Sequence, residues 1–120
     1  MGYTQRTGND AELRACQYLT EQGLKLITRN FHCRYGEIDL IMREQQTIVF
    51  VEVRYRKANS LVDGAESISP AKQARLVKSA SYYLQQNKLS DAIPARIDVI
   101  AVTQDNNTHQ FHWIQNAIEA

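Results

Sequence analysis

The sequence predicts a single α/β domain with a mixed β-sheet, and three observations lead to this fold class. Its 120 residues (1–120) are the size of one ordinary domain. Apolar residues recur at three- to four-residue spacing in two segments and alternate in others, which are the periods of helices and strands. These segments follow the order helix, three strands, helix, two strands, an order typical of α/β proteins.

The two helices have recognisable ends. The first is expected within residues 7–23, where Gly23 follows the last apolar residue as a C-cap. The second is expected to begin at Ser69 and Pro70, a hydroxyl N-cap followed by proline in the first turn. Residues 57–68 before it are rich in turn formers and are expected to form a mobile loop.

The five strands are expected where alternating runs are bounded by polar or turn residues. Residues 44–46 connect the second and third strands so closely that these two should form an antiparallel hairpin. The expected strands are 24–29, 36–43, 47–55, 96–103 and 110–114.

The net charge says little about binding partners, whereas the distribution of apolar residues bears on the location of the protein. A formal charge of +1 neither favours nor opposes a polyanionic ligand. No apolar run approaches the roughly 18 residues of a membrane span, and the N-terminus lacks a signal peptide, so we expect a cytoplasmic protein without a membrane partner. Cys16 and Cys33 lack a CxxC spacing and are expected to be reduced core residues.

Acidic residues on the predicted hairpin need an explanation, because charges are depleted in strands unless they are paired or bind a metal. Alternation places Asp39 with Ile41 on one face of the second strand, opposite Ile38, and places Glu52 on the matching face of the third strand. Like charges that face each other destabilise an antiparallel pair. We therefore expect either a staggered register or a cation between Asp39 and Glu52, and a divalent metal would supply it.

Two helical side chains are expected to face the same region. Glu12 and Gln73 each lie three, four and seven residues before apolar residues of their own helix, which places them at the start of a buried stripe. Each has a simpler alternative. Glu12 could complete a capping box begun at Asn9, and Gln73 could merely flank the core near a helix start.

Such a set of carboxylates suits phosphodiester cleavage. Mg²⁺ prefers oxygen ligands, keeps several waters and binds through one or two carboxylates plus substrate phosphate. Arg54 on the third strand would orient the attacking water or offset charge on the phosphoryl oxygens. Basic residues nearby could contact phosphates or form an ordinary solvated face. The expected phosphate contacts are Arg56, Lys57, Lys72 and Arg75.

Three stretches resemble a known family: GNDAELRACQYL at 8–19, GEIDLI at 36–41 and VFVEVRYR at 49–56. They are similar to the YraN family, bacterial proteins regarded as endonuclease-like members of the PD-(D/E)xK restriction-endonuclease superfamily, with their closest likeness to Holliday junction resolvases. The resemblance covers nearly the whole chain. It implies a three-layer α/β/α fold with a central mixed five-stranded sheet flanked by helices.

The resemblance also implies roles for individual residues. The implied catalytic set is Glu12, Asp39, Glu52, Arg54 and Gln73. The implied ligands of Mg²⁺ or Mn²⁺ are Asp39, Glu52, Glu12 and the backbone carbonyl of Val53. The superfamily has lysine where this chain has Arg54. Arginine stays protonated at any ordinary pH, so Arg54 can orient or stabilise but cannot act as a general base.

The resulting interpretation is a metal-dependent endonuclease that cleaves structured or branched DNA, with DNA preferred over RNA and a homodimer among the expected assemblies. Two alternatives come from other classes. One is a catalytically inactive nucleic-acid-binding module of the same fold. The other is a scaffold without a nucleic-acid role, in which the acids pair with Arg54 and nearby lysines.

Overall fold

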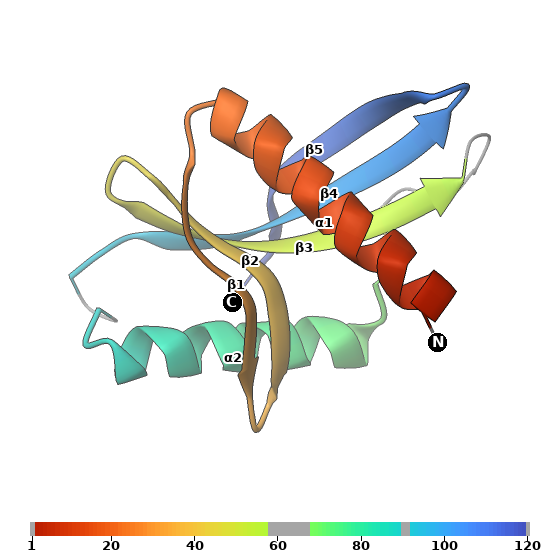
Figure 1. Cartoon of the computed structure of the whole chain (residues 1–120). Coiled ribbons are helices and arrows are strands. Elements are labelled where there is room, and N and C mark those ends of the chain that lie inside the picture. Colours follow the sequence, from red (N-terminus) through yellow and green to blue (C-terminus); the bar gives the residue numbers. More distant parts are fainter. Residues whose placement is uncertain (1, 58–67, 90–91, 120) are drawn as a thin grey trace.

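The computed structural model describes residues 2–57, 68–89 and 92–119, so residues 58–67 of the expected loop lie outside the described residues. Two helices and five strands alternate along the chain (Figure 1). The elements are α1 (Gly2–Glu21), β1 (Lys25–Cys33), β2 (Gly36–Glu44), β3 (Thr47–Lys57), α2 (Pro70–Gln86), β4 (Ala95–Asp105) and β5 (Thr108–Ile118). Neither described helix has the length and hydropathy needed to cross a membrane.

The five strands form one sheet in the order β1-β2-β3-β4-β5. Strands β3 and β4 pair in parallel and are linked through α2, whereas every other neighbouring pair is antiparallel. The sheet is therefore mixed, as expected, because the antiparallel strands β1–β2–β3 and the β4–β5 hairpin are joined by one helical crossover.

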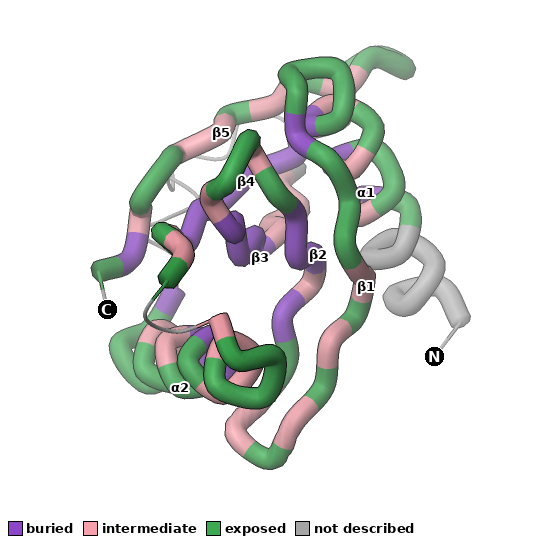
Figure 2. The backbone as a smooth tube through the Cα atoms, turned by 90° about the vertical axis from the view of Figure 1, so that its left-hand side faces the viewer, coloured by how far each residue is buried: buried purple, intermediate pink, exposed green. Residues whose placement is uncertain are grey.

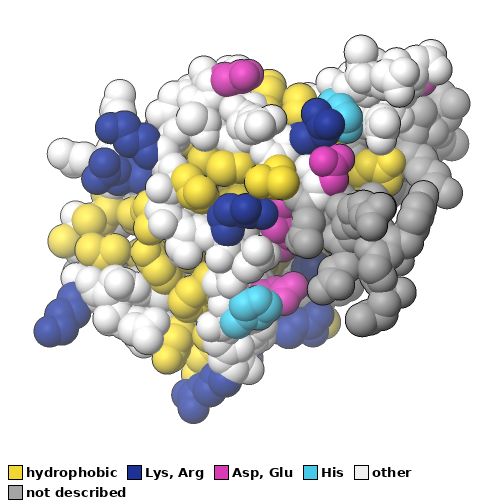
Figure 3. Space-filling view, viewed as in Figure 1, with side chains coloured by type: hydrophobic (Ala, Val, Ile, Leu, Met, Phe, Trp, Pro, Cys, Tyr) yellow, Lys and Arg dark blue, Asp and Glu magenta, His cyan; other side chains and the backbone are white. Residues whose placement is uncertain are grey.

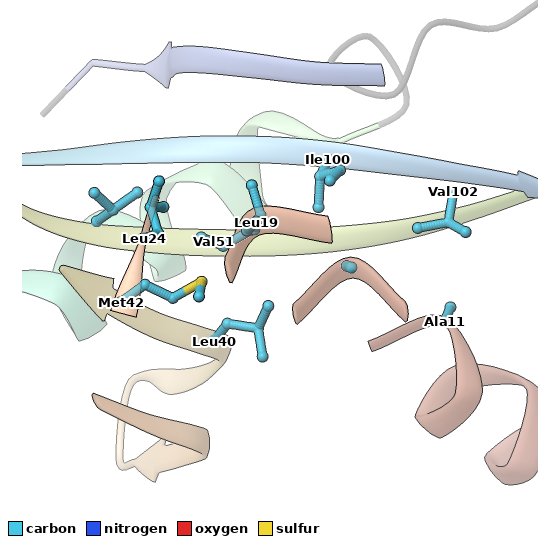
Figure 4. Close-up of a cluster of buried hydrophobic side chains, with 10 residues drawn as sticks. Ala11, Leu19, Leu24, Leu40, Met42, Val51, Ile100 and Val102 are labelled. Atoms are coloured by element: carbon cyan, nitrogen blue, oxygen red, sulfur yellow. The ribbon is translucent and has the colours of Figure 1, made fainter. Parts of the chain in front are cut away.

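Each helix covers its own face of the sheet (Figure 2). On the α1 face, Leu19 packs among residues from β2, β3 and β4 such as Met42 and Ile100 (Figure 4). On the α2 face, Leu76 packs with Phe50 and other residues of the same strands. These two cores confirm the predicted α/β class and its three α/β/α layers.

The helix ends follow their predicted caps with one correction. The Ser69 hydroxyl accepts a hydrogen bond from Lys72 N (3.1 Å), and Pro70 opens α2. Gly23 has φ +107° just after α1, a conformation that favours glycine. Helix α1, however, already begins at Gly2. Asn9 is therefore not an N-cap, and the capping-box alternative for Glu12 is wrong.

The first and last strands are longer than their sequence patterns predict. β1 continues to Cys33 and β5 to Ile118. Each contains an asparagine with positive φ, Asn30 at 55° and Asn116 at 51°. A residue in this conformation interrupts the two-residue alternation, and asparagine tolerates it better than most side chains do. The apolar pattern therefore breaks while the strand continues.

The β2–β3 ladder stops short of the acidic residues. Its last pair is Leu40 with Val51, although β3 stays paired with β4 as far as Lys57. Beyond that point Val53 N–H donates to Asp39 Oδ2 (2.8 Å). The Asp39 side chain thus takes the acceptor role that a backbone carbonyl has in a ladder.

One face assignment from the sequence is wrong. Alternation places Ile38 on the same face as Leu40, but Ile38 packs in the α2 cluster whereas Leu40 packs in the α1 cluster. The irregular backbone at Asn30 lies opposite Asp39, between the pairs Arg29–Leu40 and Phe31–Ile38. Because β1 and β2 are irregular at this level, alternation does not carry across Asp39.

Candidate active site

Three elements bring three carboxyl groups together where the β2–β3 ladder ends. Asp39 on β2 interacts electrostatically with both Glu52 on β3 and Glu12 on α1. The sequence predicted this meeting from strand alternation and from the position of Glu12 on the buried helix face. The acids can meet because the β2–β3 ladder ends at Leu40 and Val51. Beyond this pair, Val53 N–H donates to the Asp39 side chain instead of to a backbone carbonyl of β2.

Asp39 is the most perturbed of the three acids. Burial, followed by the nearby charge of Glu52, raises the pKa of its carboxyl to about 8, and Glu12 adds to the rise. The hydrogen bond from Val53 N–H acts in the opposite direction but is too weak to offset these effects. Among the described residues Asp39 has no ion-pair partner, so its carboxyl is neutral through much of the acid range.

Glu12 is held in a similar but milder environment. Burial raises the pKa of its carboxyl, Arg29 opposes that rise, and Glu37 and Glu52 add to it. Arg29 Nη2 lies 3.9 Å from Glu12 Oε1, too far for a hydrogen bond. Glu12 Oε1 is buried and accepts no hydrogen bond from a described residue. A buried acceptor in this state is free to take a new donor or a cation.

Glu52 is 3% exposed and lies beside two cations. Lys72 Nζ, from the first turn of α2, is 2.8 Å from Glu52 Oε2, and Arg54 Nη1 is 3.6 Å from the same oxygen. Arg54 thus lies next to one of the predicted acids. Lys72 was assigned by number only to phosphate contact, whereas its pairing with Glu52 is what the scaffold alternative expected of nearby lysines.

Gln73 supports the start of α2. Its Nε2 donates to the carbonyl of Ile68 (3.0 Å), while its backbone N–H donates to the carbonyl of Ser69 (2.9 Å). Both bonds fix the first turn of the helix, which carries Lys72 to Glu52. Gln73 therefore stabilises the helix turn that carries Lys72.

The remaining basic candidates occupy different places. Arg56 Nη1 donates to the carbonyl of Tyr55 (3.1 Å), and burial together with the nearby Arg54 lowers the pKa of its guanidinium. Arg75 is exposed on α2 and lines a cavity of about 420 Å³ that Lys72 also lines. Lys57 ends β3.

Comparison with known sequences places the chain in a family. The sequence profile described as "Uncharacterised protein family UPF0102" matches residues 11–102, which include all three acids and Lys72. The chain belongs to the UPF0102 family. The expected YraN-family membership is thereby confirmed.

UPF0102 relatives match over nearly their whole length. A UPF0102 protein of Coxiella burnetii is 47% identical, over 97% of this chain and 94% of its own. Relatives from Nitrosococcus oceani and Stutzerimonas stutzeri are 46% and 41% identical, over 92% and 100% of this chain. A solved structure of Pyrococcus furiosus SfsA in complex with Ca²⁺ is similar with a TM-score of 0.43 and 12% identity, covering 98% of this chain and 65% of that one.

The donor atoms of this UPF0102 site fit a hard divalent cation. They are carboxylate oxygens, which Mg²⁺ and Mn²⁺ prefer, and the buried Glu12 Oε1 has no hydrogen-bond donor among the described residues. No group of three or more His, Cys, Asp or Glu residues in the described part of the chain is arranged to hold a metal ion. A cation here would rely on two carboxylates at most, a number typical of Mg²⁺ sites that also bind substrate phosphate.

Proposed function

We propose that this UPF0102 protein is a metal-dependent endonuclease that hydrolyses phosphodiester bonds in structured or branched DNA. The observation that carries the proposal is the Asp39 carboxyl, whose pKa of about 8 reflects burial beside Glu52 and Glu12. Strongly perturbed carboxyl groups gather at functional sites more often than elsewhere. A cation that binds Asp39 and Glu52 would remove the repulsion between them.

The proposal gives each side chain a role. Asp39 and Glu52 hold Mg²⁺ or Mn²⁺, with the Val53 carbonyl as a further candidate ligand. Glu12, which the resemblance also implied as a ligand, is not needed for this set of two carboxylates. When bound, the ion supplies positive charge that polarises the phosphate and activates water for attack. The chain itself adds two cations beside Glu52, at 2.8 Å and 3.6 Å, which stabilise charge that develops on the phosphoryl oxygens.

The partners and location belong to the same proposal. We infer DNA rather than RNA as the substrate, with a homodimer as an assembly that could present two sites to one junction. The free thiols of Cys16 and Cys33 are consistent with a reducing compartment such as the cytoplasm.

A second candidate is a nucleic-acid-binding module of the same fold that does not cleave. One contact favours it: Lys72 Nζ already lies 2.8 Å from Glu52 Oε2 and supplies the positive charge that a metal would bring. In this case the acids would fix Lys72, while Arg54, Arg56 and Arg75 would contact phosphates.

Cleavage of a substrate panel tests the endonuclease directly. Purified protein is incubated with linear, single-stranded, flapped and four-way DNA in Mg²⁺, Mn²⁺ or a chelator. We expect metal-dependent products from at least one branched substrate, and background cleavage from Asp39→Asn and Glu52→Gln. Asp105→Asn, at the exposed end of β4, is the matched control and should cleave like the wild type.

Arg54→Ala separates the enzyme from the binding module. If Arg54 stabilises the transition state, its loss should lower cleavage by about a hundredfold or more and weaken DNA binding only slightly. If Arg54 is one phosphate contact among several, affinity should fall modestly and the salt dependence of binding should lose about one unit of slope. Absence of metal-dependent products from wild-type protein on every substrate would reject the endonuclease.

A further inference from the structure

Two separate cavities lie where α2 meets the turn that joins β1 to β2. Their volumes are about 420 Å³ and about 440 Å³, and each is lined by residues of both α2 and the turn region. Arg75 lines the first and Lys78 the second, and residues three apart lie on one side of a helix. We call this surface the α2 groove and define it by Tyr35, Gly36, Lys72, Arg75, Lys78 and Tyr82.

The β1–β2 turn lies directly against α2 at Gly36. A Cβ atom at this position would be in ordinary van der Waals contact with Ser79 Oγ (3.4 Å) and Arg75 Cβ (3.6 Å). Gly36 has φ +150°, a conformation that favours glycine and shapes the turn where it meets the helix.

Two tyrosines of the groove lie outside the hydrophobic core. Tyr83 packs edge-on against Phe31 and Phe50 in the α2 cluster, but its neighbour Tyr82 belongs to neither cluster formed by the described residues. Tyr82 instead meets Tyr35 at the β1–β2 turn, with ring centroids 6.0 Å apart at 64°. A partly exposed tyrosine pair contributes little to the core, so the ring surfaces that its neighbours leave uncovered are available to a ligand.

Arg34 completes the aromatic end of the groove. Its Nη2 donates to the Tyr35 hydroxyl (2.7 Å), and its Cζ lies 4.9 Å from the centre of the Tyr35 ring. This arrangement holds a guanidinium beside an aromatic ring at an exposed turn. Guanidinium planes and tyrosine rings both stack on nucleic-acid bases.

The charge of the groove is positive. Arg75 and Lys78 form no ion pair with any described residue, and Arg34 adds a third cation at the turn. The acid that lines the groove is Glu37, which lies 3.4 Å from His32. Figure 3 shows Lys and Arg side chains along the lower edge of the molecule, around the β1–β2 turn and α2. Such a surface suits a phosphate backbone.

Lys72 joins the groove to the acid site. It lines the first cavity, and its Nζ is 2.8 Å from Glu52 Oε2. We propose that the α2 groove binds an unpaired nucleic-acid strand, with phosphates on Arg75 and Lys78 and a base against Tyr35 and Tyr82, and leads that strand to the acid site. A base within a duplex has its faces covered by its neighbours, so an aromatic pair in a cavity selects an unpaired strand.

This inference deepens the proposed endonuclease and rests on it for the fate of the strand. It narrows the substrate to DNA with a single-stranded segment beside the scissile bond. Binding and cleavage are therefore measured separately, because either can fail without the other.

The test measures binding of a fluorescent single-stranded thymidine oligonucleotide by anisotropy in chelator, with a blunt duplex as competitor. We expect the single strand to bind more tightly than the duplex. Tyr35→Leu and Tyr82→Leu should each weaken single-strand binding at least about fivefold, the lower end of the cost of losing one base stack. Tyr18→Leu, which removes a tyrosine stacked on Phe111 elsewhere, is the matched control and should bind like the wild type.

Charge is tested in the same assay. Arg75→Ala should lower the salt dependence of single-strand binding by about 0.7 in slope, the value for one phosphate contact. Arg43→Ala, an exposed arginine near the far end of β2, should leave the slope unchanged. Circular dichroism of every variant confirms that it is folded.

The outcomes separate the two proposals. Equal binding of the wild type and both groove tyrosine variants, or tighter binding of the duplex, would overturn the α2 groove even if the protein cleaves branched DNA. Single-strand binding that depends on Tyr35 and Tyr82, without any metal-dependent cleavage, would support the groove and reject the endonuclease.

Discussion

Two aspartates in the same sheet have opposite surroundings. Asp98 on β4 is fully buried and accepts hydrogen bonds from Arg96 Nε (3.0 Å), Trp113 Nε1 (2.9 Å) and Asn116 N (2.8 Å). Asp39 accepts one hydrogen bond from backbone, from Val53 N–H, and faces two other acids. The Asp98 carboxylate is therefore held by a cation and two N–H donors, whereas the Asp39 carboxylate has one N–H donor and acidic neighbours.

The difference lies in how charge is balanced. At Asp98, the guanidinium of Arg96 also binds Glu44 Oε1 (2.9 Å), so one cation links two acids while two neutral N–H groups complete the site. The Asp98 carboxylate is fully hydrogen-bonded in this network, although Arg96 Nη2 is buried without an acceptor among the described residues. Hydrogen-bonded polar networks of this kind rigidify their surroundings. At Asp39 three acidic side chains lie close together, and their burial and mutual repulsion destabilise the folded protein when they are ionised. Sites that break local rules in this way are expected to be functional.

The largest effect is expected from the satisfied aspartate. Asp98→Ala leaves Trp113 Nε1 and the Asn116 N–H without their acceptor and leaves Arg96 with Glu44 alone. Breaking a buried charge pair typically costs about 3–5 kcal/mol. Urea denaturation should show a loss of this size in the free energy of unfolding. Asp105→Ala, at the exposed end of the same strand, should change stability by less than about 0.5 kcal/mol. A loss for Asp98→Ala no larger than that of its control would remove the contrast between the two sites.

Asp39→Asn should act in the opposite direction. The folded pKa of Asp39, about 8, lies above its ordinary value of 3.8, so the folded protein keeps a proton that the unfolded chain releases. Stability from this group is therefore complete below pH 3.8 and is lost as the pH rises to about 8. In chelator at pH 8, Asp39→Asn should be more stable than the wild type by at least about 1.4 kcal/mol, the equivalent of one pKa unit.

The pH dependence supplies the control for this variant. At pH 3, below the ordinary pKa of 3.8, the wild-type carboxyl is mostly protonated in both states, so Asp39→Asn and wild type should unfold at nearly the same urea concentration. A variant that loses several kcal/mol at both pH values would show that Asp39 is a structural partner, and the scaffold alternative would gain.

A divalent metal ion bound at Asp39 should stabilise the folded protein by supplying the positive charge that Arg96 supplies at Asp98. A ligand that binds only the folded protein stabilises it by about 1.4 kcal/mol at ten times its dissociation constant. Thermal melting of wild type should therefore shift upward with Mg²⁺ and return with chelator. Asp39→Asn and Glu52→Gln should lose the shift, whereas Asp105→Asn should keep it. A shift of equal size in all four proteins would place the ion elsewhere.

Local signals were enough to predict most of the fold. The order of elements, the Ser69–Pro70 start of α2 and the Gly23 cap follow from periodicity and cap chemistry within a few residues. The extent of β1 and β5 could not be predicted, because a left-handed Asn30 or Asn116 breaks the apolar alternation without ending the strand.

Strand alternation predicted only part of the site. It indicated that Asp39 and Glu52 lie close together. The contact between Lys72 and Glu52 depends on how α2 packs on the sheet, which no local sequence pattern encodes. Asp98 attracted no attention in the sequence because its partners Trp113 and Asn116 lie on β5, fifteen and eighteen residues away. A buried acid with distant donors and one with acidic neighbours look alike in sequence.

The smallest change in stability is expected at Arg54, the position where the related superfamily has lysine. Arg54→Lys keeps the positive charge near Glu52 Oε2, and Lys72 still lies 2.8 Å from that oxygen, so the free energy of unfolding should change by less than about 0.5 kcal/mol. Lysine loses only the forked donor geometry of arginine. If the protein is an endonuclease, Arg54→Lys should retain or gain cleavage activity. If it is a binding module that uses the bidentate guanidinium to bind phosphate, Arg54→Lys should bind DNA more weakly. Urea denaturation, cleavage and DNA binding of wild type and Arg54→Lys, all at one salt concentration, measure these differences. A large loss of stability would show that Arg54 has a structural role like that of Arg96 beside Asp98.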